Sequence, residues 1–151
     1  MEDIEDFKKS IGKKSRLLGI DPGKKRVGIA ISDENKLVST PLKTIIKKNN
    51  TNVISDILEI IKENNIKGIV VGNPINMDGS KGPSSQSAKD FAKNLSNNIS
   101  IPIVMWDERL SSQGAFNLSS NLGINTSKKV KKLDQNAASF KLQGAIDYIK
   151  R

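Results

Sequence analysis

Carboxylates that follow apolar runs are the residues of this sequence best suited to chemistry. Asp21 ends one apolar run and is followed at once by a Pro-Gly pair, Asp107 and Glu108 end a second run, and Asp134 lies where the last helical pattern begins. An ionised carboxylate is costly to remove from water unless it is paired or binds a metal. Acids that converge at the ends of buried strands, in a basic chain, therefore predict a Mg²⁺ or Mn²⁺ site that acts on phosphates.

The composition restricts the chemistry open to this chain. Its 151 residues favour a single domain, and 25 basic against 16 acidic residues give a net charge of +9, which favours an anionic partner over a merely solvated basic surface. The sequence contains no cysteine and no histidine. Disulfides, thiolate nucleophiles, zinc–sulfur sites and imidazole bases are therefore excluded. No apolar run reaches the length of a membrane span and no signal peptide is visible, so a cytoplasmic protein without membrane contact is expected.

Apolar patterns predict the elements that must position these acids. Strands are expected at 17–21, 27–32, 37–46, 66–71 and 101–106. Helices are expected around 53–61, 88–95, 111–122 and from 130 to the last residues. A meander of three strands followed by alternating helices and strands predicts an α/β fold, with a five-stranded mixed sheet, helices on both faces and Asp21 near the centre. Pro41 predicts that the third strand lies at an edge or contains a bulge.

Two further features of the chain bear on the site. Residues 1–16 are dominated by charge and predict a flexible tail or frayed helix before a single domain at 17–151. Ligands of open α/β sheets bind beyond the carboxyl ends of the strands. Asp21 and the Asp107–Glu108 pair occupy two such ends, which would place them side by side if their strands are neighbours.

Four short segments carry a resemblance to a known family. They are Leu18–Gly23 with Val27–Asp33, then Val70–Gly79, Asp107–Ser112 and Asp134–Ala138. In this order and at this chain length they resemble the YqgF, or RuvX, family of RuvC-like nucleases, and the resemblance covers nearly everything after residue 16. It implies a ribonuclease H-like fold in a cytoplasmic bacterial protein that processes the 5′ end of pre-16S ribosomal RNA. Some members of the family are proposed to resolve branched DNA.

The resemblance assigns roles to individual acids. Asp21, Glu108 and Asp134 match the catalytic, metal-binding acids of the family. Adjacent side chains of a strand point to opposite faces, so only one of Asp107 and Glu108 is expected to face the metal. The resemblance favours Glu108, and Asp107 is the less favoured alternative. Two Mg²⁺ or Mn²⁺ ions about 3.5–4 Å apart would activate water, neutralise the phosphate and stabilise the leaving oxygen.

Basic residues beside these acids predict contacts with nucleic acid. They are Lys24, Lys25, Arg26, Arg109, Lys128, Lys129, Lys131 and Lys132. The expected partners are precursor ribosomal RNA, branched DNA and the small ribosomal subunit. The residues do not decide between RNA and four-way DNA as the substrate.

Each of these residues also has a plainer interpretation. Asp21 before Pro-Gly can simply initiate a turn, Asp134 can complement a helix dipole, and Glu108 can form a surface ion pair with Arg109. The lysine run before Asp134 can be a solvated helix face. At the level of function, a non-catalytic RNA-binding or ribosome-assembly factor would need the basic surface and no metal. An actin-like ATPase shares the Asp-x-Gly turn, but its duplicated lobes make a longer chain.

Overall fold

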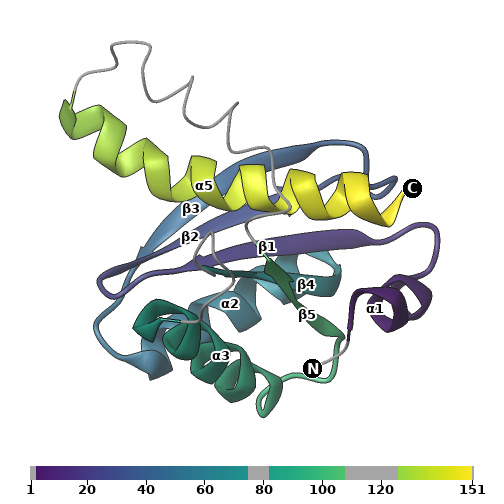
Figure 1. Cartoon of the computed structure of the whole chain (residues 1–151), viewed down its shortest axis with the longest axis horizontal. Helices are drawn as coiled ribbons and strands as arrows, with labels where there is room; N and C mark the ends of the chain where they lie inside the picture. Colours follow the sequence, from purple (N-terminus) through teal and green to yellow (C-terminus); the bar gives the residue numbers. More distant parts are fainter. Residues whose placement is uncertain (1–2, 75–81, 108–125, 151) are drawn as a thin grey trace.

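A five-stranded sheet forms the centre of the protein, with strands in the order β3-β2-β1-β4-β5 (Figure 1). The structure, a computed structural model, describes residues 3–74, 82–107 and 126–150, with the backbone alone at residues 84 and 126–135. The strands are β1 (Arg16–Pro22), β2 (Arg26–Ser32), β3 (Ser39–Ile46), β4 (Ile66–Asn73) and β5 (Ile103–Asp107). The helices are α1 (Ile4–Ile11), α2 (Asn50–Asn64), α3 (Pro83–Ser96) and α5 (Thr126–Ile149).

The sheet is mixed, as the order of elements predicts. β1 pairs antiparallel with β2 and β2 antiparallel with β3, whereas β1–β4 and β4–β5 are parallel pairs. β1 is the third of the five strands, so the prediction that Asp21 lies near the centre of the sheet is confirmed. The helix predicted at 111–122 lies outside the described residues.

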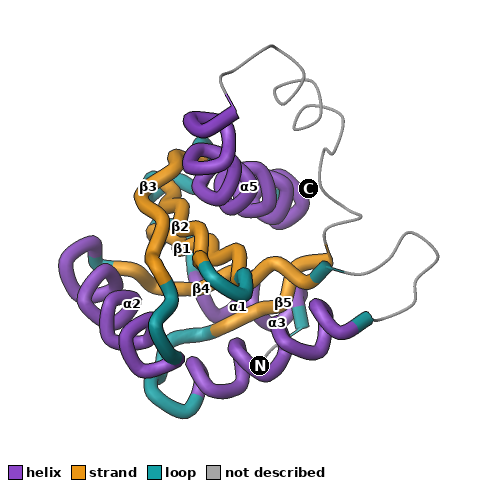
Figure 2. The backbone as a smooth tube through the Cα atoms, turned by 90° about the vertical axis from the view of Figure 1, so that its left-hand side faces the viewer, coloured by secondary structure: helices purple, strands orange, loops and turns teal. Residues whose placement is uncertain are grey.

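Helices cover both faces of the sheet, which confirms the second part of the fold prediction (Figure 2). α1 and α5 pack on one face, in a core cluster that contains Leu17 of β1 and Trp106 of β5. α2 and α3 pack on the other face, against a cluster that contains Leu18 and Ile20. Because side chains alternate along a strand, Asp21 shares the α5 face with Leu17.

The third strand is an edge strand and also carries a bulge. Pro41 lies opposite Ala30, and the register of β2 against β3 shifts between Ile29 and Ala30. Proline has no N–H to donate, so it is tolerated where one side of the strand has no partner or where pairing is interrupted. Both features expected from Pro41 are therefore present.

Part of the N-terminal segment, for which a flexible tail or frayed helix was predicted, is a helix packed on the sheet. Residues 4–11 form α1, capped by the Asp3 carboxylate, which accepts a hydrogen bond from the N–H of Asp6 at 2.8 Å. Phe7 and Ile11 are buried against the sheet at Gly68, where a Cβ would lie only 2.9 and 2.8 Å from their side chains. Apolar residues at helical spacing, separated by charged ones, gain enough buried surface here to dock the helix.

Candidate active site

Asp21 lies at the carboxyl end of the central strand, one residue before β1 ends at Pro22. The chain then turns sharply into β2. Gly23 is required in this turn, because a Cβ there would lie 2.4 Å from the carbonyl oxygen of Arg26. The Asp21 side chain is 23% exposed. The central strand thus presents a carboxylate at its carboxyl end, where the side chain is partly buried and still open to solvent.

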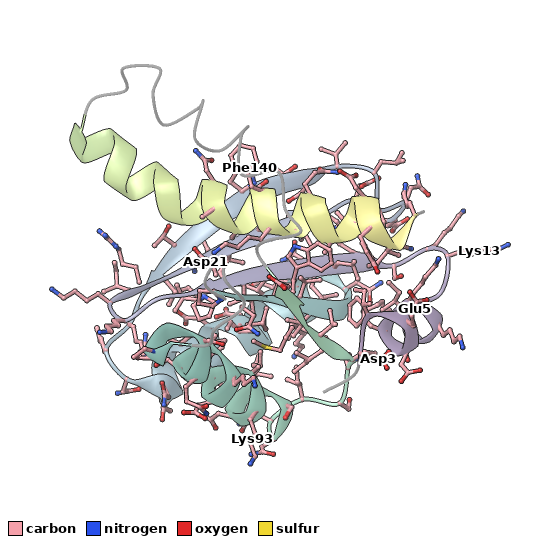
Figure 3. All side chains as sticks on the ribbon, in the orientation of Figure 1. Asp3, Glu5, Lys13, Asp21, Lys93 and Phe140 are labelled. Atoms are coloured by element: carbon pink, nitrogen blue, oxygen red, sulfur yellow. The ribbon has the colours of Figure 1, made fainter. Side chains whose placement is uncertain are left out.

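Lys141 of α5 is the partner of Asp21. Its Nζ lies 2.5 Å from Asp21 Oδ1, and the Lys141 side chain is 16% exposed. This charge-assisted hydrogen bond joins residues 120 positions apart and connects α5 to the central strand. The side chains of Asp21 and neighbouring residues appear in Figure 3. Lys141 is not among the residues predicted from the sequence. Its position seven residues after Asp134, two turns along one helix face, is the signal that could have identified it.

A close approach of α5 to β1 makes this contact possible. Gly19 lies two residues before Asp21 on the same face, and a Cβ at Gly19 would lie 2.7 Å from Leu142 Cβ and 3.3 Å from the Ala138 carbonyl oxygen. Real Cβ atoms do not come so near. The absence of a side chain at Gly19 therefore lets α5 lie directly on the strand that ends in Asp21.

The direction of α5 determines where Asp134 lies along the sheet. α5 runs opposite to β1 and crosses Gly19 near Ala138 (Figure 1). Position 134 is four residues earlier, about 6 Å back along the helix, and Asp21 lies two residues beyond Gly19, about 6.6 Å along the strand. The backbone at position 134 is therefore on the Asp21 face of the sheet and toward the Asp21 end. The side chain of Asp134 lies outside the described residues.

Asp107 lies on the opposite face. It pairs with Asn73 of β4, whose Oδ1 accepts a hydrogen bond from Ser85 Oγ of α3 at 2.8 Å. Ile103 and Met105, which alternate with Val104 and Trp106, likewise pack into the cluster under α2 and α3. Asp107 therefore faces α3, whereas Asp21 faces α5. Glu108 and Arg109 lie outside the described residues.

β1 and β5 are not neighbouring strands, because β4 lies between them. Two strand spacings, about 10 Å, separate their ends. The condition under which Asp21 and Asp107 would lie side by side, that their strands are neighbours, is therefore not met.

One of the three proposed metal ligands, Asp21, offers oxygen donors at this site. Within residues 3–74, 82–107 and 136–150, no three acidic side chains come together that could hold a metal ion. Of the proposed ligands Asp21, Glu108 and Asp134, Asp21 is the one whose side chain the structure describes, and its Oδ1 is bound by the Lys141 ammonium. Oxygen donors of this kind suit Mg²⁺ and Mn²⁺. Whether Glu108 and Asp134 complete the donor set stays a prediction.

The basic residues predicted to bind nucleic acid divide into two groups. Lys24 and Lys25 are exposed in the β1–β2 turn and Arg26 is half-buried at the start of β2, so all three lie beside Asp21. Lys128, Lys129, Lys131 and Lys132 are in the first turns of α5, where only the backbone is described. None of the helices in the described parts of the chain is long and apolar enough to cross a membrane.

The sequence is similar to those of known proteins. The family model RuvX, described as Holliday junction resolvase, matches residues 15–148. A Pelagibacter ubique protein named "Putative pre-16S rRNA nuclease" is 56% identical over 146 residues, covering 97% of both chains. A protein of the same name from Ruegeria sp. is 42% identical over 144 residues, covering 95% of this chain and 92% of its own.

Solved structures share the fold at low sequence identity. Thermus thermophilus RuvC in complex with a Holliday junction substrate superposes with a TM-score of 0.59 at 13% identity, covering 89% of this chain and 94% of that one. The fowlpox virus Holliday junction resolvase gives 0.50 at 16% identity, covering 89% and 98%. The fold is therefore the ribonuclease H-like fold of the RuvC resolvases. Since the family model spans all but the ends of the sequence and two relatives match nearly end to end, this chain belongs to the RuvX family.

Proposed function

We propose that this protein is a metal-dependent nuclease that processes the 5′ end of pre-16S ribosomal RNA as part of small-subunit maturation. The observation that carries the proposal is the Asp21 carboxylate at the end of the central strand, held by a cation from the helix that also bears Asp134. The RuvX family description, the relatives' names and the net charge of +9 support nucleic acid as the substrate.

Asp21, Glu108 and Asp134 are the residues that would hold the metal. Asp107 faces α3, which favours Glu108 as the acid from the end of β5. α5 lies on the Asp21 face and runs so that position 134 is near the Asp21 end, which favours Asp134. When bound, Mg²⁺ or Mn²⁺ ions, two in the mechanism we propose, supply the activation of water and the neutralisation of the phosphate.

The remaining residues of the site would orient the catalytic carboxylate and the substrate. Lys141 fixes the Asp21 side chain through Oδ1, so that a carboxylate at the end of the strand has one orientation. Lys24 and Lys25 are exposed in the adjoining turn, where they can contact phosphates on either side of the bond to be cleaved. Catalysis by histidine or cysteine is not available to this chain.

Lys141 and a metal ion would compete for Asp21. Replacing Lys141 with methionine removes the ammonium and keeps much of the side-chain volume, so we expect Mn²⁺ to bind about tenfold more tightly, since hydrogen bonds to charged groups contribute about 1.5–3 kcal/mol. Lys141→Arg, which keeps the positive charge, is the matched control and should bind Mn²⁺ as the parent does. Isothermal titration calorimetry measures both affinities. Equal or weaker Mn²⁺ binding by Lys141→Met would show that Asp21 does not bind the ion.

A cleavage comparison tests the function itself. A labelled pre-16S RNA fragment and a four-way DNA junction are incubated with the protein in Mg²⁺, Mn²⁺ or EDTA. The proposal predicts cleavage of the RNA with either metal and none in EDTA. Cleavage of the junction alone would instead support a resolvase, the activity in the family description. Binding of RNA without any cleavage would support a non-catalytic assembly factor.

A further inference from the structure

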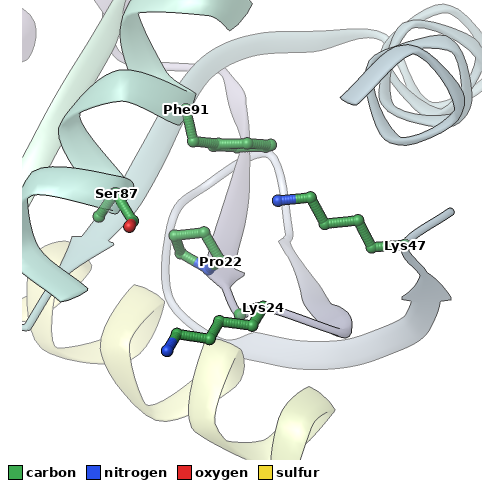
Figure 4. A pocket seen from close by; sticks show the side chains of 7 residues that line it. Pro22, Lys24, Lys47, Ser87 and Phe91 are labelled. Carbon is green, nitrogen blue, oxygen red and sulfur yellow. The ribbon is translucent and has the colours of Figure 1, made fainter. Parts of the chain in front are cut away.

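A small pocket lies on the other side of the strand end that carries Asp21 (Figure 4). Its volume is about 120 Å³. It is formed by the β1–β2 turn, the residue after β3 and the first half of α3. The lining residues are Pro22, Gly23, Lys24, Lys47, Ser87, Ala88 and Phe91. Of these, only Lys24 is among the residues that the sequence analysis predicted to bind nucleic acid.

Two lysines line this one pocket, and the Lys47 ammonium points into it, whereas the Lys24 side chain extends away from Lys47 (Figure 4). Lys24 belongs to the turn after β1, and Lys47 follows β3; the backbone N–H of Lys47 donates to the carbonyl oxygen of Lys25 at 2.9 Å, which holds the two segments together. Among the described residues neither side chain has an ion-pair or hydrogen-bond partner. A cation inside the pocket, with a second lysine at its rim, attracts an anion, and phosphate is the anion a nuclease meets.

The walls of the pocket are apolar. Phe91 and Ala88 of α3 and the ring of Pro22 form them, and Lys47 directs its ammonium between the Phe91 ring and Pro22 (Figure 4). Ser87 adds a hydroxyl at the rim. Phe91 is 8% exposed and belongs to the core cluster under α2 and α3, so only the part of its ring that borders the pocket can meet a ligand. An aromatic side chain beside a cation is an arrangement with which proteins hold a single-stranded nucleotide, with the base or sugar against the ring and the phosphate against lysine.

The size of the pocket limits what can enter it. Pockets that enclose whole small molecules usually have about 300–1,000 Å³, and this one is less than half as large. It therefore suits one unit of a longer ligand better than a free metabolite. A base that is paired in a duplex cannot turn into such a pocket without unstacking, whereas an unpaired base can.

We propose that this pocket binds one unpaired nucleotide of the substrate strand, next to the phosphodiester at Asp21. Pro22 follows Asp21 directly and faces the pocket, so a strand that crosses this end of the sheet passes from the Asp21 face to the α3 face. The inference rests on the proposed nuclease function and specifies it further. The protein selects substrates that are single-stranded beside the cleavage site, as an RNA end can be and the arms of a DNA junction are not.

Lys47→Ala tests the pocket, with Lys48→Ala as the matched control. Both changes remove one positive charge from adjacent residues, but only Lys47 lines the pocket. Binding of a labelled single-stranded RNA is measured by fluorescence anisotropy over a salt series, in EDTA so that nothing is cleaved. We expect Lys47→Ala to weaken binding about fivefold and to flatten the slope of log K against log salt by about 0.7, the value for one phosphate contact on a single strand. Lys48→Ala should change the slope much less.

Two further measurements separate the pocket from general electrostatics. Blunt duplex RNA should lose no more affinity with Lys47→Ala than with Lys48→Ala. Phe91→Leu, which keeps the α3 packing apolar, should weaken single-strand binding without changing the salt slope; circular dichroism checks that it is folded. The proposal would be overturned if Lys47→Ala and Lys48→Ala lost the same affinity for single-stranded RNA. It would also be overturned if Lys47→Ala lost as much affinity for duplex RNA as for single-stranded RNA.

These outcomes are distinct from a failure of the nuclease function. If the parent protein cleaves RNA but Lys47→Ala binds single-stranded RNA like Lys48→Ala, the proposed nucleotide pocket is refuted and the nuclease function is supported. If Lys47→Ala loses single-strand binding but the parent cleaves nothing under any metal condition, the nucleotide pocket is supported and the proposed catalysis is refuted.

Discussion

Replacing Asp21 with asparagine is expected to lower cleavage about a thousandfold while nucleic-acid binding stays the same or becomes tighter. Asparagine keeps the size of the side chain and one acceptor oxygen but removes the charge that would hold the ion. A bound metal contributes several kcal/mol to stabilisation of the transition state, and each 1.4 kcal/mol is a factor of about ten in rate. Binding does not suffer, because the lost carboxylate no longer repels phosphate and the Lys141 ammonium is no longer neutralised by Asp21.

Asp147→Asn provides the control for this experiment. The chemical change is identical, and Asp147 is exposed near the end of α5, where it accepts a hydrogen bond from Gln143 Nε2 at 3.0 Å. The Asp147→Asn variant should cleave the RNA at the parent rate. Rates are measured on the labelled RNA with Mg²⁺ in excess, and affinities by anisotropy in EDTA. Undiminished cleavage by Asp21→Asn, with contaminating nuclease removed, would show that Asp21 is a turn residue and that the activity lies elsewhere.

The sheet could be predicted because each of its strands has a recognisable local sequence pattern. Short apolar runs bounded by turn residues identify all five strands, and the single proline of β3 indicates an edge. α1 could not be predicted in the same way. Three apolar residues among charged ones are too weak a local signal, and the helix docks because the sheet offers Gly68 as a place for Phe7 and Ile11. That complementarity exists only in the folded chain.

The sequence predicted which acids form the candidate site, but not which face of the sheet each acid lies on or which residues it contacts. The sequence leaves Asp107 and Glu108 as alternatives, and the pairing of Asp107 with Asn73, itself bonded to Ser85 of α3, places Asp107 on the face away from Asp21. The sequence places Lys141 on the same helix face as Asp134 but does not show which residue it contacts, for a related reason. Its contact with Asp21 depends on α5 lying on β1 and running opposite to it, which no local pattern encodes.

Gly19→Ala is the substitution expected to separate folding from catalysis most clearly. The new Cβ would start 2.7 Å from Leu142 Cβ, so α5 must move back by a distance on the order of 1 Å to restore ordinary contact. Overpacking of this kind costs about 1–3 kcal/mol of stability. The helix that moves carries Lys141 and Asp134, and a 1 Å misplacement of catalytic groups can lower a rate about 100-fold. Urea denaturation measures the loss of stability, and RNA cleavage measures the loss of rate.

The control is Gly12→Ala, which should destabilise the protein without moving α5. Gly12 caps α1 with φ +72° and ψ −171°, a conformation that costs a side-chain-bearing residue about 1–3 kcal/mol, while its new Cβ would meet no atom within 4 Å. Both variants therefore lose a similar amount of stability for different reasons, one through backbone strain and the other through displacement of α5. When both are assayed well below their unfolding transitions, Gly12→Ala should cleave at the parent rate and Gly19→Ala far more slowly. Equal rates would mean that the distance between α5 and β1 does not control catalysis, and that α5 contributes no metal ligand.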